Sequence, residues 1–75
     1  MKNKEKKDKI VVEGTVVKAL PDTTFRVKLD SGKEIFTYLA GKMKVHYVRV
    51  IPGDRVKVEI SAYDLEKGRI VYRLK

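Results

Sequence analysis

Residues 25–39 read FRVKLDSGKEIFTYL, and this stretch decides the fold. Apolar and polar residues alternate over 25–29, a polar, glycine-containing segment follows at 30–32, and over 34–39 the two-residue period of a strand places Ile35, Thr37 and Leu39 on the same face as the apolar residues of 25–29. Alternation is typical of a half-buried β-strand, and a short glycine-containing segment between two strands is typical of a hairpin. The sequence therefore predicts two antiparallel strands that turn one face toward a core.

The outer face of this hairpin is expected to carry two aromatic rings among cations. Because positions two apart share one face of a strand, Phe36 and Tyr38 should lie outside, beside Arg26 and Lys28. Exposed rings can stack on nucleic-acid bases while neighbouring cations contact phosphates. A ring that covers a seam of a barrel gives the same pattern, so base stacking on Phe36 and Tyr38 is one of two alternatives.

The segment before the hairpin predicts a long first strand over residues 10–19, followed by a proline-containing turn over 20–23. Gly14 interrupts this strand, and a glycine inside a strand usually marks a bulge or a sharp bend. A small barrel needs such a bend where one strand serves both halves of the sheet. Residues 1–9 have no apolar periodicity and are expected to form a disordered basic tail, which leaves 10–75 as the domain.

The segment after the hairpin predicts an insert and two more strands. Residues 41–47 do not alternate and are expected to form a short helix or an irregular turn. After a turn over 51–54, alternation returns over 55–60, and a polar loop is expected over 61–68. In the last strand, inward positions are expected for Ile70 and Tyr72, and outward positions for Arg69, Val71 and Arg73.

Five strands with an insert after the third, in fewer than 80 residues, have the element order of an OB-fold barrel. An SH3-like barrel also has five strands. The position of the insert and the glycine-bent first strand favour the OB-fold, so the expected fold class is all-β, a five-stranded OB-fold barrel. Closure of the barrel removes exposed strand edges.

The charge of the chain points to a polyanionic partner. Its 75 residues include 18 Lys and Arg against 10 Asp and Glu, which gives a formal net charge of +8. Two stretches, 35–53 and 67–75, contain several Lys and Arg residues and no acidic residue. Such one-sign stretches are more typical of phosphate contact than of a surface that is basic only for solubility.

The residue inventory argues against an enzyme and against a metal site or cofactor. The chain has no cysteine and a single histidine, His46, so no disulfide, zinc or thiol chemistry is expected. No general-base partner lies near either of its two serines in the sequence. No apolar run approaches the ~20 residues that span a bilayer, and residues 1–9 lack the apolar part of a secretory signal, so a cytosol-like compartment without a membrane partner is expected.

Individual motifs also resemble one family, bacterial translation initiation factor 1, over roughly residues 10 to 73 and without gaps. The motifs that carry the resemblance are Gly14-Thr15-Val16, Leu20-Pro21, Phe25-Arg26-Val27, Gly41-Lys42-Met43, Tyr47-Val48-Arg49, Gly53-Asp54 and the run from Tyr63 to Arg73. The chain departs from the usual family pattern at Lys44, His46, Tyr38 and Ala62, where Arg, Asn, His and Pro are common. Lys44 keeps the charge of an arginine but lacks its planar fork for bidentate phosphate contact.

The resemblance implies a monomeric OB-fold factor that binds the small ribosomal subunit at the decoding A site, contacting rRNA and a nearby ribosomal protein and assisting the other initiation factors. It implies a cytoplasmic location, or the plastid stroma for a plastid-encoded member. With the one-sign stretches, it gives the expected rRNA contacts Arg26, Lys42, Lys44, Tyr47, Arg49, Lys67, Arg69 and Arg73.

Two other functions compete with this one. A general single-stranded RNA-binding or RNA-chaperone protein of the cold-shock kind would have the same fold, but its pair of aromatic-rich strand motifs is missing from a chain with six aromatic residues. A basic barrel without a nucleic-acid partner would be expected to intersperse acidic residues in both one-sign stretches.

Overall fold

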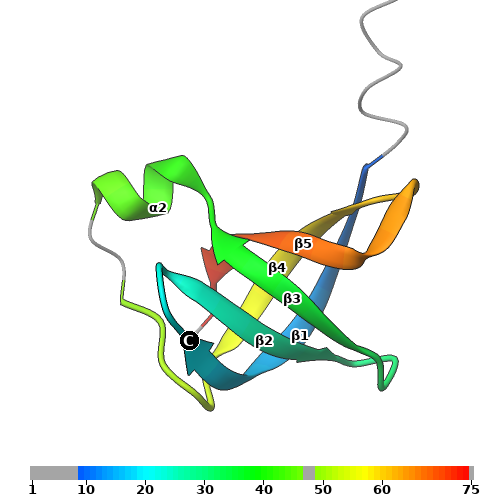
Figure 1. The fold of residues 1–75 in the computed structure, drawn as a ribbon, viewed down its shortest axis with the longest axis horizontal. Helices are drawn as coiled ribbons and strands as arrows, with labels where there is room; N and C mark the ends of the chain where they lie inside the picture. The colour runs from blue at the N-terminus through cyan, green and yellow to red at the C-terminus, as the bar shows by residue number, and fades with distance from the viewer. Residues whose placement is uncertain (1–8, 47–48, 75) are drawn as a thin grey trace, which may run out of the picture.

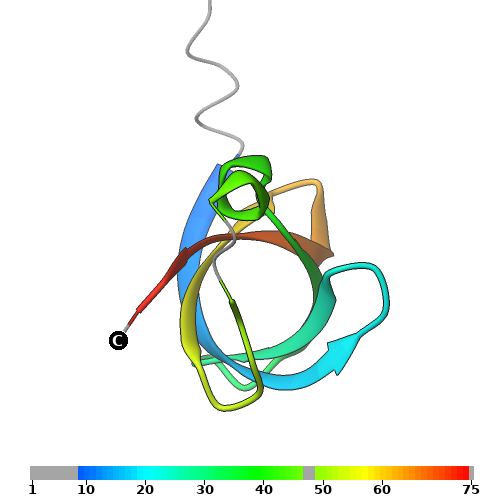
Figure 2. The ribbon, with the colours of Figure 1, turned by 90° about the vertical axis from the view of Figure 1, so that its left-hand side faces the viewer.

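Five β-strands close into a barrel in the order β1-β2-β3-β5-β4 in the computed structural model, which describes residues 9–46 and 49–74 (Figure 1). The elements along the chain are β1 (Lys9–Leu20), β2 (Thr24–Leu29), β3 (Glu34–Leu39), α2 (Gly41–Val45), β4 (Arg55–Ser61) and β5 (Asp64–Arg73). All strand pairs are antiparallel except β3 with β5, which run parallel and complete the ring seen end-on in Figure 2. The expected OB-fold, with a short helix between its third and fourth strands, is confirmed.

Closure depends on β1, because this strand pairs with β2 and with β4 at once. At its middle, Gly14 lies opposite Leu29 on one side and Val56 on the other. A Cβ added at Gly14 would lie 2.7 Å from the carbonyl oxygen of Lys28 and 2.8 Å from Cγ1 of Val27. Gly14 is therefore needed for the close approach of two backbones where the strand bends around the barrel.

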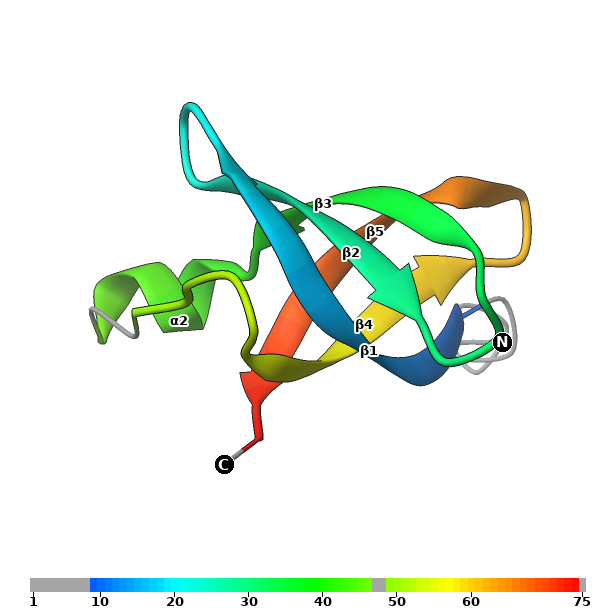
Figure 3. The ribbon, with the colours of Figure 1, turned by 90° about the horizontal axis from the view of Figure 1, so that it is seen from below.

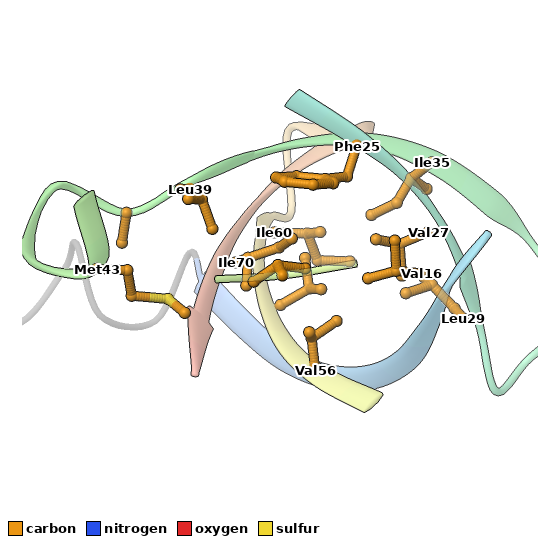
Figure 4. Packing of buried hydrophobic residues seen from close by; sticks show 13 residues of the cluster. Val16, Phe25, Val27, Leu29, Ile35, Leu39, Met43, Val56, Ile60 and Ile70 are labelled. Carbon is orange, nitrogen blue, oxygen red and sulfur yellow. The ribbon is translucent and has the colours of Figure 1, made fainter. Parts of the chain in front are cut away.

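The barrel interior is filled by β-branched side chains from all five strands (Figure 4). Val27, Val56, Val58 and Ile70 are fully buried. Thr37 is also fully buried, and its hydroxyl donates a hydrogen bond of 2.9 Å to the carbonyl of Phe25. Met43 of α2 is 4% exposed and joins the cluster at the helix end of the barrel. Alternation in the sequence thus reports the inner face correctly over most of the sheet.

The predicted polar loop over 61–68 is wrong, because β5 already begins at Asp64 and only residues 62–63 separate it from β4. The first four residues of β5 are exposed, which is why their sequence looks like a loop. They are nevertheless held by backbone pairing: Lys67 lies opposite Phe36 of β3, and Asp64 lies opposite Ser61 of β4. Strand structure here comes from the sheet ladder and not from burial.

Two β-bulges change which side chains face outward. On β5, Ile70 lies opposite Val58 and Tyr72 lies opposite Lys57, so Val71 is the extra residue. The prediction that Tyr72 points inward is therefore wrong: Tyr72 is 57% exposed. The outward position expected for Val71 is also wrong, because its side chain is half-buried and packs against the core.

The second bulge lies on β1. Val16 is opposite Val27 and Lys18 is opposite Arg26, so Val17 is the extra residue. Unbroken alternation would turn Lys18 to the same face as the buried Val16, but the bulge turns it to the outer face. A bulge therefore adds one exposed cation that alternation would have placed inside.

Replacement of Gly14 by alanine is expected to destabilise the barrel, because the added methyl group must displace the backbone of β2. Overpacking of this kind costs about 1–3 kcal/mol of unfolding free energy, which lowers the Tm of a domain of this size by at least about 4 °C. Gly41→Ala is the matched control, because a Cβ at Gly41, the first residue of α2, meets no atom within 4 Å. Thermal unfolding followed by circular dichroism measures both. Equal Tm values for Gly14→Ala and Gly41→Ala would show that close approach at Gly14 does not limit the fold.

Candidate nucleic-acid interface

The helix α2 lies at one end of the barrel, on the side where β5 ends (Figure 3). Residues of α2 and of the end of β5 line a cationic groove there. The helix is fixed there by Met43, which is buried, and by Ala40, whose backbone N–H donates to the carbonyl of Ile70 at 2.9 Å. The groove has a volume of about 460 Å³. Its lining consists of Lys42, Met43, His46, Val71, Tyr72 and Arg73, and we call it the helix groove.

The charge of the helix groove is of one sign. None of the described residues that line it carries a carboxylate, whereas Lys42 and Arg73 contribute cationic groups. Arg73 is held by a hydrogen bond of 3.0 Å from its Nη1 to the carbonyl of Arg49, which brings Arg49 beside the groove. The Nζ of Lys57 lies 5.9 Å from the ring centroid of Tyr72. This arrangement offers cations and an exposed ring to an anionic ligand.

A second cationic surface lies on the outside of the β2-β3-β5 sheet. Cross-strand register places Arg26, Phe36 and Lys67 in one row and Tyr38 and Arg69 in the next. Phe36 is 42% exposed and Tyr38 is 47% exposed, so both rings lie outside as alternation predicts. We call this surface, with Lys18 at the end of the first row, the aromatic sheet face.

The expected rRNA contacts therefore divide between two surfaces. Lys42 and Arg73 line the helix groove and Arg49 lies beside it, whereas Arg26, Lys67 and Arg69 lie on the aromatic sheet face. Lys44 is exposed on α2. Tyr47 lies outside the described residues, as does the expected tail except for Lys9, the first residue of β1.

Carboxylates on neighbouring strands hold two cations of the aromatic sheet face. Arg69 pairs with Glu59 of β4, and Nε of Arg26 lies 3.8 Å from the carboxylate of Glu34 on β3. The one-sign stretch 67–75 therefore has an acidic neighbour in space that it lacks in sequence. Because Glu59 already pairs with it, Arg69 is less available to an anionic ligand than the absence of acidic residues from 67–75 indicates.

Arg55 is a cation with a different task, because it is surrounded by acidic and hydroxyl groups. Its guanidinium donates to both carboxylate oxygens of Asp30, at 2.7 and 2.9 Å, and also to Glu13 at 3.2 Å and Thr15 at 3.1 Å. These hydrogen bonds, with a smaller coulombic contribution, hold the pKa of Asp30 below its ordinary value and raise the pKa of Arg55. Arg55 therefore ties the β2-β3 turn to β1 and β4 and is not part of either surface.

Sequence reasoning missed two residues of these surfaces, Tyr72 and Lys18, and also Lys57, which lies beside Tyr72. Lys18 and Tyr72 are turned outward by bulges at Val17 and Val71, and a valine at these positions does not indicate a bulge. Lys57 was missed because its contact with Tyr72 depends on the outward position of that ring. Among the described residues, the structure contains no group of three or more His, Asp or Glu that would suit a metal ion. No helix in the described part of the chain has the length and apolar character to cross a membrane.

A single OB-fold barrel with exposed rings and cations on its surface defines a class, the small nucleic-acid-binding OB proteins. Within that class, a family model described as translation initiation factor 1A / IF-1 matches residues 1–75. The chain belongs to this family, and its role is that of a translation initiation factor.

Two solved structures are similar to this chain, the first in sequence and fold and the second in fold. The solution structure of bacterial translation initiation factor 1 from the Wolbachia endosymbiont strain TRS of Brugia malayi is 47% identical, with a TM-score of 0.76, and the match covers 99% of this chain and 87% of that one. The crystal structure of YjeQ from Thermotoga maritima is 24% identical, with a TM-score of 0.71, over 88% of this chain and 23% of that one. The second likeness shows the fold alone.

The Arg55 cluster predicts a pH-dependent contribution to stability. Because the folded pKa of Asp30 is lowered, its pairing stabilises the fold above the unfolded pKa of about 3.9, and this contribution is lost as the pH falls through the folded value. We expect Asp30→Asn to lower the Tm at neutral pH, and the gap from the unaltered protein to close in acid.

Thermal unfolding over a pH series tests this expectation. Glu66→Gln is the control, because the pair of Glu66 with Lys33 is exposed and contributes little at any pH. A Tm gap for Asp30→Asn that stays constant from neutral to acidic pH would contradict the assigned role of this carboxylate.

Proposed function

We propose that the protein binds the small ribosomal subunit during initiation and that the helix groove is its main contact with ribosomal RNA. The observation that carries this proposal is the set of cations in a groove whose described lining has no carboxylate, on a chain of the initiation factor family. Phosphate groups of RNA carry the negative charge that is absent from the lining of this groove. When Lys and Arg neutralise these phosphates, the counterions bound to the RNA are released. A duplex or a loop of rRNA would be held by charge and positioned by the groove's shape.

Roles within the groove follow from position. Lys42 and Arg73 would contact phosphates from opposite walls, since one lies on α2 and the other on β5. Arg49 and Lys44 would contact the same RNA from the rim. Tyr47, which lies outside the described residues, is kept as a contact because of the family resemblance. Tyr72 offers an apolar surface between these cations for a sugar or a base.

Docking at the decoding A site, contact with a nearby ribosomal protein and assistance to the other initiation factors belong to the same proposal. The role is one of binding without catalysis, carried out by a monomer in the cytoplasm. It rests on family membership together with the charge of the groove. Arg26, Lys67 and Arg69 lie on the other surface, where they would meet a different stretch of RNA.

Removal of one groove cation tests the proposal. We expect Lys42→Gln to weaken binding to purified small subunits about tenfold and to make the log–log salt dependence shallower by about 0.7–0.9, the value of one lost phosphate contact. Lys33→Gln removes the same charge from the β2-β3 turn, where Lys33 lies 3.3 Å from Glu66. It is expected to change neither quantity measurably.

Fluorescence anisotropy of labelled protein, titrated with small and with large subunits over a salt series, gives both numbers. Equal losses for Lys42→Gln and Lys33→Gln would mean that net charge alone attracts the protein. Equal affinity for both subunits would overturn the ribosomal part of the proposal.

A further inference from the structure

The start of β1 has an unpaired edge in the described part of the chain. β4 pairs with β1 from Lys9 to Thr15, whereas β2 pairs with it only from Gly14 onward. Residues 9–13 therefore have a partner strand on one side alone. This start of β1 lies at the end of the barrel away from α2, as two views show (Figure 1; Figure 3).

The backbone groups of Val11 point to this open side. In an antiparallel ladder, residues that hydrogen-bond to one neighbouring strand alternate with residues that face the other side. The carbonyl of Glu13 accepts a hydrogen bond of 3.0 Å from the N–H of Asp30, at the start of the β2-β3 turn, so Glu13 faces away from β4. By the two-residue period, Val11 and Lys9 face the same way. The N–H and C=O of Val11 can therefore pair with an added strand.

The side chains along this edge are apolar and exposed. Ile10 is 42% exposed and Val11 is 56% exposed. An exposed apolar edge is a template for pairing with another chain, and proteins usually protect it with a charged residue or a proline. Residues 10–12 are isoleucine and valine, so they supply neither. The edge thus has both the backbone groups and the apolar surface that bind an extended peptide as an extra strand.

A depression beside this edge carries negative charge. It has a volume of about 340 Å³ and is lined by Val11, Val12, Glu13, Leu29, Asp30 and Ser31, which include two carboxylates and no lysine or arginine. Glu13 and Asp30 share one cation, Arg55, and their side chains remain 46% and 60% exposed. One cation against two carboxylates leaves an excess of one negative charge here, on a chain whose net charge is +8.

Charge and backbone geometry together indicate the class of partner. The two carboxylates repel RNA phosphates, and a nucleotide chain has no N–H and C=O groups that extend a sheet ladder. A second copy of this chain would bring another net charge of +8 to the contact. The edge is also only five residues, about 17 Å, long, which is short for the ~1,000 Å² that a stable interface buries. An extended segment of another protein with apolar residues and a lysine or arginine matches the ladder, the apolar edge and the carboxylates.

We propose that residues 9–13 form a docking edge, on which an extended, cation-bearing segment of a partner protein adds as a further strand and places its Lys or Arg beside Glu13 and Asp30. The docking edge and the helix groove lie at opposite ends of the barrel and share no residue, so RNA and a partner protein can be bound at the same time (Figure 3). Peptide binding at the docking edge does not rest on the ribosomal proposal.

The test uses the full chain and a short peptide of alternating valine and lysine with blocked ends. Anisotropy of the labelled peptide gives its Kd, and hydrogen exchange measured by NMR follows single N–H groups of the protein. In the free protein, we expect the N–H of Val11 to exchange faster than those of Ile10 and Val12, which face β4. Peptide at about ten times its Kd is expected to slow exchange at Val11 about tenfold, because the edge is then unoccupied for only about a tenth of the time.

A proline at the docking edge tests the role of the backbone. Val11→Pro removes the outward N–H but no bond to β4, so the protein is expected to fold and to bind the peptide at least about tenfold more weakly. Val11→Thr is the matched control: it keeps the N–H and a β-branched side chain and is expected to change Kd less than about threefold. Val12→Pro removes a donor of the β1-β4 ladder, so its Tm is expected to be lower than that of Val11→Pro. If Val11→Pro unfolds, exchange at Val11 in the unaltered protein decides the question.

Two further peptides test the chemistry of the partner. One replaces each lysine by glutamate, which faces Glu13 and Asp30 with like charge, and the other carries a methyl group on every amide nitrogen and cannot donate to the ladder. Neither is expected to slow exchange at Val11. Slowing by all three peptides, no slowing by the valine-lysine peptide, or equal losses in Val11→Thr and Val11→Pro would overturn the docking edge.

Two controls separate this proposal from its competitors. Exchange at Val11 that slows as the protein concentration rises, without peptide, would assign the edge to a second copy and overturn the proposal. Lys42→Gln is expected to leave peptide binding unchanged, because Lys42 lies in the helix groove. Binding of the small subunit is measured separately with Val11→Pro, so failure of the docking edge is distinguished from failure of the ribosomal proposal.

Discussion

Closure of the barrel through β1 is the constraint on which the rest of the molecule depends. One strand must pair with β2 and β4 at once, and it can do so only because Gly14 has no side chain at the point where the backbones approach. The ring that results buries one face of every strand around Val27, Val56 and Ile70. The cations and rings of the helix groove and of the aromatic sheet face therefore lie outside this core, on the outer face of the sheet and at the helix end.

Bulges on the closed sheet then determine what those outer faces carry. The extra residue at Val17 turns Lys18 toward Arg26, and the extra residue at Val71 turns Tyr72 toward Lys57. Each bulge adds an exposed side chain to one surface: a cation to the aromatic sheet face and a ring to the helix groove. Acidic residues are used elsewhere, mainly to hold Arg55 and Arg69. The separation of free cations from paired ones explains how a chain with 10 acidic residues still presents a groove without them.

Much of this could be predicted from local sequence, and the failures come from bulges, strand register and tertiary contacts that local sequence does not encode. Alternation predicts the hairpin strands and the exposure of Phe36 and Tyr38 because a strand has a fixed two-residue period. Alternation fails to predict the outward position of Tyr72, because a valine such as Val71 is common in regular strands and does not indicate that the two-residue period shifts there. It also cannot reveal that Glu59 meets Arg69, since that contact depends on the register of two strands. Lys42 and Arg73 line one groove because of tertiary structure, and in the sequence only the resemblance to a family indicated that they share a role.

The central claim is that the helix groove, and not the total positive charge, binds the small subunit. The extent of lysine acetylation in the free and in the subunit-bound protein, measured at each site by mass spectrometry, tests this claim without any amino-acid substitution. The account predicts strong protection of Lys42 by the small subunit, while Lys33, in the β2-β3 turn and paired with Glu66, stays as reactive as in the free protein. Equal protection of both lysines, or protection of Lys33 alone, would contradict it.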